Sequence, residues 1–405
     1  MNADAWRVTL VAALLMAIAS GLRSAQGLFV SVLNGSTGLG LASLSLVFAV
    51  GQLTQGFSQP ALGALADRVG AARVIVVSAL AFALATAVIA LESAPIAVAL
   101  ALIAASVAAG TLGASPLLLG EVNRRVDAAR AGFAAGLVSA GVPLGQLVLG
   151  PGTQQVIERC GWRGALLATA VVGLCALPLA RMLRRPGAQT AAPTERPPSQ
   201  PIADVLRDRR FWLVAGSFCA CGFHVAFLAV HMPGVIGRCG LSASVAGIWI
   251  AVAAAANIAG SLAIGHALRS HDGARLLVAI YLLRALGIVG LLLLTPSVEV
   301  MLGFALVMGA SHMATLPPTA QLVARQHGVQ RLASLLGIVM LVHQLGSFAG
   351  IWFGGWAAQA TGNDRLLWLV DIGLALGAAT LVWPLRARRD RHTATRIGAA
   401  VQPQG

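Results

Sequence analysis

Residues 63–91 read GALADRVGAARVIVVSALAFALATAVIAL, and this stretch decides the fold. From position 72 onward it is an apolar run whose only charged side chain is Arg73. The run is long enough to cross the hydrocarbon core of a bilayer, about 30 Å thick, as an α-helix. The preceding residues form a short polar segment with Asp67 and Arg68 between two glycines, Gly63 and Gly70. This order predicts that one membrane helix ends and the next begins around this segment.

Apolar runs of the same kind recur along all 405 residues. The chain is 58% hydrophobic and only 10% charged, and a soluble protein needs more charge to cover its surface. Short alternating segments typical of membrane β-barrels are absent, which leaves helices as the spanning structure. We therefore predict an all-α integral membrane protein with twelve transmembrane helices. Their predicted ranges are 8–33, 41–66, 72–91, 95–120, 131–157, 163–183, 211–235, 243–268, 275–294, 299–323, 331–358 and 365–385.

A proline-rich segment divides the chain into two halves. Residues Pro186 to Pro201 are polar and can bury nothing, which is typical of a flexible linker. Residues Ile202 to Arg210 favour a short helix at the membrane surface. The predicted domains are an N-terminal six-helix bundle (1–185), a cytoplasmic linker (186–210) and a C-terminal six-helix bundle with a cytoplasmic tail (211–405).

The two halves match each other at an offset of 201 or 202 residues. Glycine matches arise easily by chance in a chain with 46 glycines. The arginine matches are more informative, because each falls at the same loop position in both halves. Parallel repeats of this kind place a substrate site between the halves, near the middle of the membrane. The matched pairs include Gln55 with Asn257, Arg73 with Arg275, Arg124 with Arg325, Arg130 with Arg331, Gly136 with Gly337, and Gly145 with Gly346.

The formal charge of +14 comes from 28 basic residues, all of them Arg. They gather between the apolar runs, mostly on alternate loops, which indicates membrane topology rather than nucleic-acid binding. The pattern predicts a multi-pass protein of the cell inner membrane, monomeric, with both termini in the cytoplasm. No ATP-binding Gly-rich loop with Lys, nucleophile triad or metal-ligand spacing is found, so we expect no enzyme activity, no cofactor and no metal.

Residues 63–73 resemble the loop motif of the major facilitator superfamily, Gly-x-Leu-Ala-Asp-Arg-x-Gly-x-x-Arg. The resemblance implies the major facilitator fold and a gating role for this loop. Gly63 would allow close helix packing, Gly70 would turn the chain, and Asp67 would cap a helix or pair with an Arg across the cytoplasmic gate. The motif residues are Gly63, Asp67, Arg68, Gly70 and Arg73.

Further segments resemble the bacterial monocarboxylate-transporter-like branch of that superfamily, near the oxalate/formate carriers. This resemblance implies alternating-access transport of small organic anions, often together with a proton. One departure is that the better-known monocarboxylate carriers have an Asp-Arg pair in helix 8, where this chain has Asn257 and no central charge. The similar segments are GLRSAQG (21–27), CGFHVAF (221–227), YLLRAL (281–286) and HQLG (343–346).

Arg23, well inside the first predicted helix, is the leading candidate for binding substrate. A guanidinium can hold a carboxylate in a bidentate fork, although an Arg fixed to backbone carbonyls for packing is the alternative. Burying an uncharged amide in the membrane costs less free energy than burying a charged group, and the chain has such amides at Gln55, Asn257 and Gln344. They are candidates for substrate binding or for hydrogen bonds between helices.

His224 and His343 lie near the middles of predicted helices 7 and 11. They are candidates for substrate binding and for proton coupling, because imidazole titrates in the physiological range and we expect no Asp or Glu in the central cavity. The alternative is a neutral His hydrogen-bonded between helices. His231, two turns from His224 on the same face and nearer the outer end, is a candidate for lining the entrance, and His312 is a weaker candidate for the site.

Arg284 and Asp371 are ionisable residues in predicted helices 9 and 12. A buried charge needs a partner or a cavity. Because these helices are expected to be neighbours, we predict a structural ion pair between the two side chains. A role for Arg284 in the substrate site is the alternative.

Three functions compete. A carrier of small organic anions, monocarboxylate-like and coupled to protons, agrees best with a positive cavity. The alternative is an exporter of a hydrophobic drug or metabolite, a class that usually keeps a buried acid. A sensor that binds without transporting is disfavoured because no soluble output domain is present.

Overall fold

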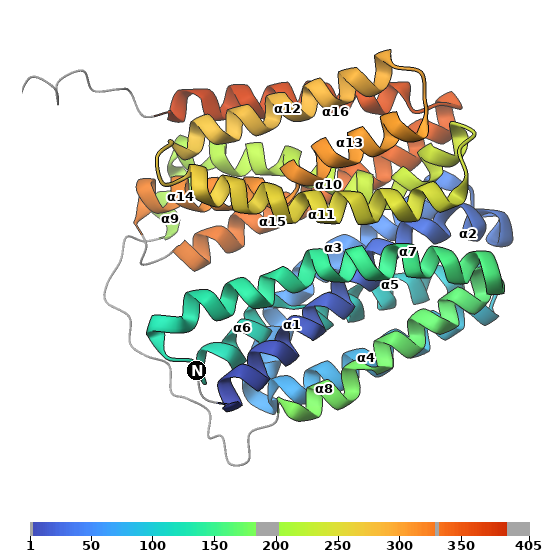
Figure 1. Ribbon diagram of the computed structural model, residues 1–405, viewed down its shortest axis with the longest axis horizontal. Coiled ribbons are helices and arrows are strands. Elements are labelled where there is room, and N and C mark those ends of the chain that lie inside the picture. Colours follow the sequence, from blue (N-terminus) through green and yellow to red (C-terminus); the bar gives the residue numbers. More distant parts are fainter. Residues whose placement is uncertain (1–2, 184–201, 329–331, 387–405) are drawn as a thin grey trace, which may run out of the picture.

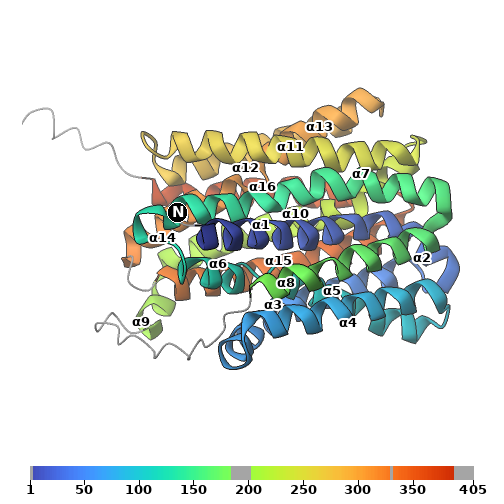
Figure 2. The same ribbon diagram turned by 60° about the horizontal axis from the view of Figure 1, so that its bottom comes forward.

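Two α-helical bundles lie side by side in the computed structural model, with most helices running along its long axis (Figures 1 and 2). The structure describes residues 3–183, 202–328 and 332–386. These residues form helices and no strands, so the predicted all-α fold is confirmed. The linker residues 186–201 and the tail after residue 386 lie outside the described residues.

The first bundle is built from the elements before the linker, and the second from those after it. The first contains α1 (Ala3–Ser24), η1 (Ala25–Phe29), α2 (Val30–Thr37), α3 (Leu41–Val69), α4 (Ala71–Leu91), α5 (Pro95–Leu112), α6 (Ser115–Asn123), α7 (Ala128–Leu174) and α8 (Ala176–Met182). The second contains α9 (Ile202–Arg207), α10 (Arg209–Arg238), α11 (Ala243–Ala267), α12 (Gly273–Leu293), α13 (Val298–Ser311), η2 (Met313–Thr315), α14 (Leu316–His327), α15 (Leu332–Thr361), α16 (Arg365–Val382) and η3 (Trp383–Leu385).

Eleven segments among the described residues are long and apolar enough to cross a membrane. One of them, Phe133–Met182, has 50 residues. At 1.5 Å per residue it would extend about 75 Å, far beyond a single crossing. Gly161 breaks it with φ 72° and ψ 169°, and the chain reverses there (Figure 1). This segment therefore accounts for two of the twelve predicted spans, 131–157 and 163–183.

Two predicted spans are interrupted where proline occurs. The chain leaves the helix after α5 and resumes it at Ser115, just before Pro116, and η2 separates α13 from α14 just before Pro317. Proline supplies no N–H and clashes with the preceding turn, so a helix gives way there. The interruption before α14 leaves backbone carbonyls inside the second bundle without a hydrogen-bond partner from the helix itself.

The same close helix crossing occurs in both bundles. A Cβ atom at Gly145 of α7 would overlap the backbone oxygen of Ala17 on α1, and one at Gly346 of α15 would overlap that of Cys219 on α10. Gly145 and Gly346 are partners in the sequence repeat, so the repeat is visible in three dimensions. Small residues allow such approach between membrane helices, where packing rather than the hydrophobic effect drives association.

We call the two ends of the molecule the linker end, which holds the N-terminus, α9 and α14, and the far end, which holds α2 (Figures 1 and 2). The bundles touch each other from their middle to the far end. The contacts are Gly56 with Gln344, Gly150 with Ile250, Gly247 with Pro151, Gly27 with Ala229, Gly355 with Ser45, and the Ala42 N–H donating to Gln359 Oε1 at 2.7 Å. At Gly63, Gly136, Gly265 and Gly337, nearer the linker end, no described atom lies within 4 Å of a Cβ position. Among the described residues, the bundles are thus closed against each other at the far end and apart at the linker end.

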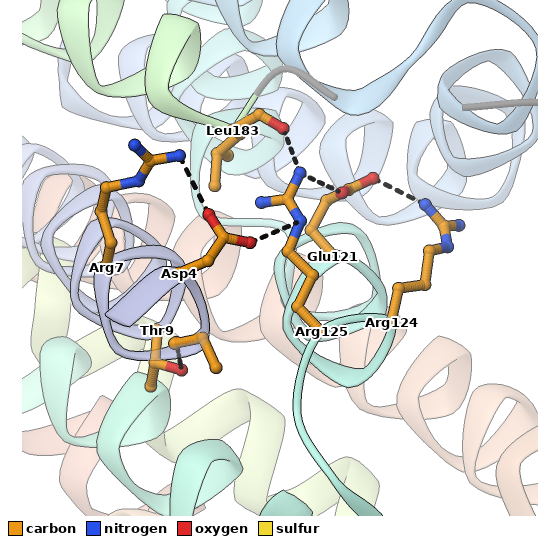
Figure 3. Close-up of polar contacts among 8 residues, drawn as sticks. Asp4, Arg7, Thr9, Glu121, Arg124, Arg125 and Leu183 are labelled. Carbon is orange, nitrogen blue, oxygen red and sulfur yellow. Dashed lines mark hydrogen bonds and ion pairs between the residues drawn. The ribbon is translucent and has the colours of Figure 1, made fainter. Parts of the chain in front are cut away.

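A buried guanidinium ties helices of the first bundle together at the linker end (Figure 3). The Arg125 side chain is only 4% exposed. It donates to the Leu183 carbonyl at 2.7 Å and lies 3.7 Å from Glu121 and 3.9 Å from Asp4. The cluster joins the start of α1 to the residues that follow α6 and α8, and Arg7 adds an exposed pair to Asp4 at 3.0 Å.

We expect Arg125→Met to lower the free energy of unfolding by about 1–3 kcal/mol, because it leaves the Leu183 carbonyl without its donor and removes one of the two cations beside the buried Glu121. Arg7→Met is the matched control and should cost less than about 1 kcal/mol, since that pair is solvent-exposed. Thermal unfolding in detergent measures both. Equal losses from the two variants would contradict a structural role for the buried cluster.

Candidate functional site

Arg23 lies in the last turn of α1 and has an exposed side chain. Its Nη2 makes a long contact of 3.5 Å to Gln52 Oε1 on α3. Gln52 in turn donates to Gln344 Oε1 on α15 at 3.3 Å. Since α15 belongs to the second bundle, this polar chain crosses from one bundle to the other, and the guanidinium lies beside the space between them.

No carboxylate neutralises Arg23 in the part of the chain that the structure describes, because no Asp or Glu oxygen there lies within 4.0 Å of it. Arg is always protonated in proteins. An unmatched positive charge in a region of low dielectric constant attracts an anion more strongly than it would in water. The contact to Gln52 leaves most of the guanidinium N–H groups available to a ligand.

His224 and Asp371 form a buried pair between α10 and α16. His224 Nδ1 lies 2.6 Å from Asp371 Oδ2, and the two residues are 3% and 1% exposed. On the other side of the ring, Nε2 lies 3.1 Å from the sulfur of Met308 on α13. The sequence interpretation expected no acid at the central cavity. No Asp or Glu lines the pocket described below, but a buried carboxylate, Asp371, lies directly behind His224.

Arg284 does not pair with Asp371, so the predicted ion pair is wrong. Arg284 is 1% exposed, and it donates to Ser311 Oγ at 3.1 Å, to the Ser311 carbonyl at 2.6 Å and to the His312 carbonyl at 3.3 Å. The physical reason is the interruption between α13 and η2, where unpaired backbone carbonyls accept the guanidinium. Asp371 is thereby left to His224.

A pocket of about 600 Å³, part of it open to solvent, lies between the bundles beside His224. Ser24 and Gln146 contribute from the first bundle, and all other lining residues come from the second. Most of its wall is apolar, with a few polar groups that could orient a ligand. The lining residues are Ser24, Gln146, His224, Val225, Leu228, Ala229, Pro233, Trp249, Ile250, Ala253, Asn257, Met308, Gly309 and His312.

The amides predicted for the site are used in three different ways. Asn257 lines the pocket, but its Oδ1 accepts from the Met313 N–H at 3.1 Å and from Ser261 at 3.3 Å. It thus satisfies an N–H released by the interruption after α13. Gln55 is 6% exposed and packs on Gly110 of α5, inside the first bundle. Gln344 takes part in the chain from Arg23.

His343 lies at the crossing of α10 and α15 and does not line the pocket. Its ring packs against Phe218 with centroids 4.8 Å apart, and its Nδ1 is 3.4 Å from Ser347 Oγ. This is the environment of a His held between helices, which was the alternative interpretation. His231 lies on the same crossing, where its Nε2–H donates to the Ile351 carbonyl at 2.8 Å.

Sequence reasoning did not place Gln146, Ser24 and Met308 at the site. Gln146 could have been found as the one amide in the apolar run 131–150. Ser24 and Met308 carry no such signal, because Ser and Met are ordinary in membrane helices. His312, a weaker candidate, lines the pocket and lies within electrostatic reach of Arg23, Arg284, His224 and His343.

The loop motif between α3 and α4 is only partly described. Gly70 turns the chain with φ 91°, as predicted. The expected close packing at Gly63 is wrong for this conformation, because the bundles are apart at the linker end. Arg73 donates to the Val69 carbonyl at 3.3 Å and Arg68 is exposed. The side chain of Asp67, and with it the predicted cap or gate pair, lies outside the described residues.

Two helical bundles with a pocket between them define the class: a helical membrane transport protein. The profile of the Major Facilitator Superfamily matches residues 12–351 and, in a second alignment, 232–403. The chain belongs to the major facilitator superfamily. The superfamily predicted from the loop motif is therefore confirmed, and the chain is a transporter of that superfamily.

Similar proteins include monocarboxylate transporters and an antiporter. Monocarboxylate transporter 13 from Bos taurus is 25% identical over 88% of this chain and 84% of its own length. The oxalate:formate antiporter of Oxalobacter formigenes is 26% identical over 61% of this chain and 59% of its own. A solved bacterial homolog of the human lysosomal transporter Spinster, described as inward-facing and occupied, superposes with a TM-score of 0.72 at 13% identity. It covers 96% of this chain and 100% of its own, a likeness of fold alone.

Proposed function

We propose that this protein is a secondary active transporter of a small organic anion, monocarboxylate-like and proton-coupled, working by alternating access. The observation that carries the proposal is Arg23, an unneutralised guanidinium beside the space between the bundles. A carboxylate would replace the weak contact to Gln52 with a bidentate, charge-assisted pair. The names of the similar transporters agree with an organic anion as cargo.

The pocket favours an anion with an apolar body. Trp249, Ile250 and Leu228 form apolar wall. Arg23 does not itself line the pocket, but the next residue, Ser24, does, and we assign to Arg23 the positive charge that meets the substrate. One guanidinium matches one carboxylate, and an apolar wall offers a second carboxylate no partner. We therefore place monocarboxylates with a hydrocarbon or aromatic portion above small dicarboxylates. Gln344, through Gln52, would position Arg23.

The proposed location is the cell inner membrane, with the linker end in the cytoplasm. Arg residues collect in the segments on that side, including Arg124, Arg125 and Arg325, as expected for cytoplasmic loops. In this orientation the conformation described above is open toward the cytoplasm. Proton coupling is assigned to His224, which lines the pocket, with His343 as the second candidate. We propose that the protein acts as a monomer.

An exporter of a hydrophobic drug or metabolite is the second candidate. The apolar pocket wall and the buried acid Asp371 both favour it, and the acid removes one reason for rejecting this class. The two candidates differ in the charge of their cargo, since Arg23 repels a cation.

Counterflow in proteoliposomes separates the two candidates. Liposomes loaded with unlabelled acid should accumulate the same radiolabelled acid from outside, with formate, oxalate, lactate and benzoate as the panel. We expect the largest counterflow for an acid with an apolar portion and competition by other monocarboxylates. Counterflow of a cationic dye, with no counterflow of any acid, would instead favour the exporter of a hydrophobic drug or metabolite.

A further inference from the structure

The carboxylate behind His224 has a role beyond packing. We infer that His224 and Asp371 act together as the site that binds and releases the transported proton, with Met308 holding the proton on His224 Nε2. This inference rests on the proposed function and assigns it a residue, Asp371, that the sequence interpretation placed in a different ion pair.

The hydrogen-bond pattern indicates how many protons the pair holds. Asp371 Oδ2 and His224 Nδ1 are 2.6 Å apart, so one proton lies between them. A thioether sulfur is only an acceptor. The 3.1 Å contact from Nε2 to Met308 is therefore favourable when Nε2 also carries a proton. Whichever atom owns the shared proton, a pair with both protons is neutral overall.

Loss of one proton would leave the pair with a net negative charge. That charge would lie in a helix interior where both residues are almost fully buried. Nε2 would then be an acceptor facing an acceptor, so the contact to Met308 would be lost. Both effects favour the doubly protonated pair unless a positive charge compensates.

Two positive charges, Arg23 and Arg284, lie within electrostatic reach of His312, which lines the same pocket as His224, and they would couple protonation of the pair to the anion. Arg23 and Arg284 are each without a carboxylate within 4.0 Å in the described chain. A deprotonated pair would offset part of this positive charge and weaken the attraction for an anionic substrate. A protonated pair leaves it intact. By linkage the anion then binds more tightly to the protonated protein, and the proton binds more tightly when the anion is present.

The proton can reach the pair from the pocket. The His224 ring lines the pocket, whereas Asp371 does not. A proton arriving from the pocket therefore meets Nε2 first, and the shift of the second proton toward Asp371 needs no further movement. Release to the other side requires only that the pocket open to that side.

Other ionisable groups surround the pair, and the test must separate it from them. Nearer the linker end, α11 and α14 carry His266, Arg325 and His327. Nearer the middle of the helices, the ionisable groups are Cys221 and His231 on α10, His343 on α15, Tyr281 and Arg284 on α12, His312 after α13 and Arg23 on α1. None of these makes a hydrogen bond to Asp371, whose one recorded bond is to His224.

Asp371→Asn tests the pair, because Asn can still accept from His224 Nδ1 but cannot exchange a proton. Proteoliposomes are given the panel acid with the largest counterflow and an inward gradient of one pH unit, with protein-free liposomes as the baseline. One coupled proton accumulates the anion about tenfold in the wild type, since each factor of ten in proton activity is about 1.4 kcal/mol. We expect Asp371→Asn to lose this accumulation, and anion-dependent proton entry followed with a trapped pH dye, while counterflow persists.

Asp364→Asn is the matched control. Asp364 lies just before the same helix, pairs with Arg238 at 2.6 Å and does not line the pocket. It should keep both accumulation and proton entry. Accumulation by Asp371→Asn equal to that of the wild type would overturn the inference. So would loss of counterflow in a folded Asp371→Asn protein. Absence of counterflow in the wild type would instead reject the proposed function.

Met308→Leu provides a second test that conserves side-chain volume and should fold. The substitution removes the acceptor of the Nε2 proton and so weakens proton binding. We expect the pH at which coupled uptake is half-maximal to move to a more acidic value. An unchanged pH profile would show that Met308 does not hold the proton and would overturn the inference.

Discussion

Proteoliposomes containing Arg23→Ala are expected to lose acid uptake and counterflow almost completely, while the purified protein remains folded. Hydrogen bonds to charged groups contribute about 1.5–3 kcal/mol each, so losing the two bonds of a bidentate pair weakens anion binding by at least about a hundredfold. The loss should be larger here because no second cation takes part in the proposed contact. Arg23 makes one long hydrogen bond within the protein, so its removal should cost little stability.

Two further variants distinguish charge from geometry. Arg23→Lys keeps the positive charge but not the planar fork, and we expect weakened but measurable uptake. Arg163→Ala removes an exposed Arg that lies over Trp162 at the far end, and it should leave uptake unchanged. Thermal stabilisation of purified protein by the panel acids checks binding directly, because a ligand that binds the folded state raises its stability. Wild-type uptake by Arg23→Ala would remove the basis for calling the protein an anion carrier.

Gly145→Leu is expected to destabilise the first bundle severely. A side chain at this position of α7 would overlap the backbone oxygen of Ala17, and backbone in the middle of a helix cannot move aside as a flexible side chain can. Overpacking costs about 1–3 kcal/mol, and we expect at least the upper end of that range. The thermal unfolding midpoint in detergent and the yield of monodisperse protein measure the effect.

Gly136→Leu is the matched control for this substitution, because Gly136 lies on the same helix with no described atom within 4 Å of a Cβ position. The gain in helix propensity is the same for both variants, so it cancels. Gly346→Leu should repeat the loss in the second bundle if the repeat extends to helix packing. A midpoint for Gly145→Leu as high as that for Gly136→Leu would refute the close crossing.

The predicted spans needed little correction, because the bilayer constrains them strongly. The run 72–91 appears as α4, Ala71–Leu91, and the run 365–385 as α16 with η3. The reversal at Gly161 falls between two predicted spans, and the interruptions fall at Pro116 and Pro317. Hydropathy, glycine and proline predict spans, turns and helix breaks from the local sequence, because these features do not depend on which helices pack against each other.

The candidate site was predicted less completely. Sequence reasoning identified His224 and Asp371 as ionisable residues at membrane depth, yet it assigned Asp371 to Arg284. The error came from choosing partners by helix order and depth alone. Arg284 had an alternative that no pattern reveals, namely the carbonyls of Ser311 and His312. Gln55 faces Gly110 and not the pocket. Which of these a Gln faces likewise depends on how its helix is rotated about its axis.

The sequence by itself determined that this chain crosses a membrane many times, in two related halves with a loop motif between α3 and α4. A bilayer core admits only backbone that satisfies its own hydrogen bonds, so apolar length is enough to define each span. Only the tertiary structure decided that Asp371 lies behind His224, and that the bundles meet at the far end and part at the linker end. Which side chains contact each other between helices depends on how the helices are rotated and how they cross. Side-chain packing determines both, and hydropathy carries no information about either.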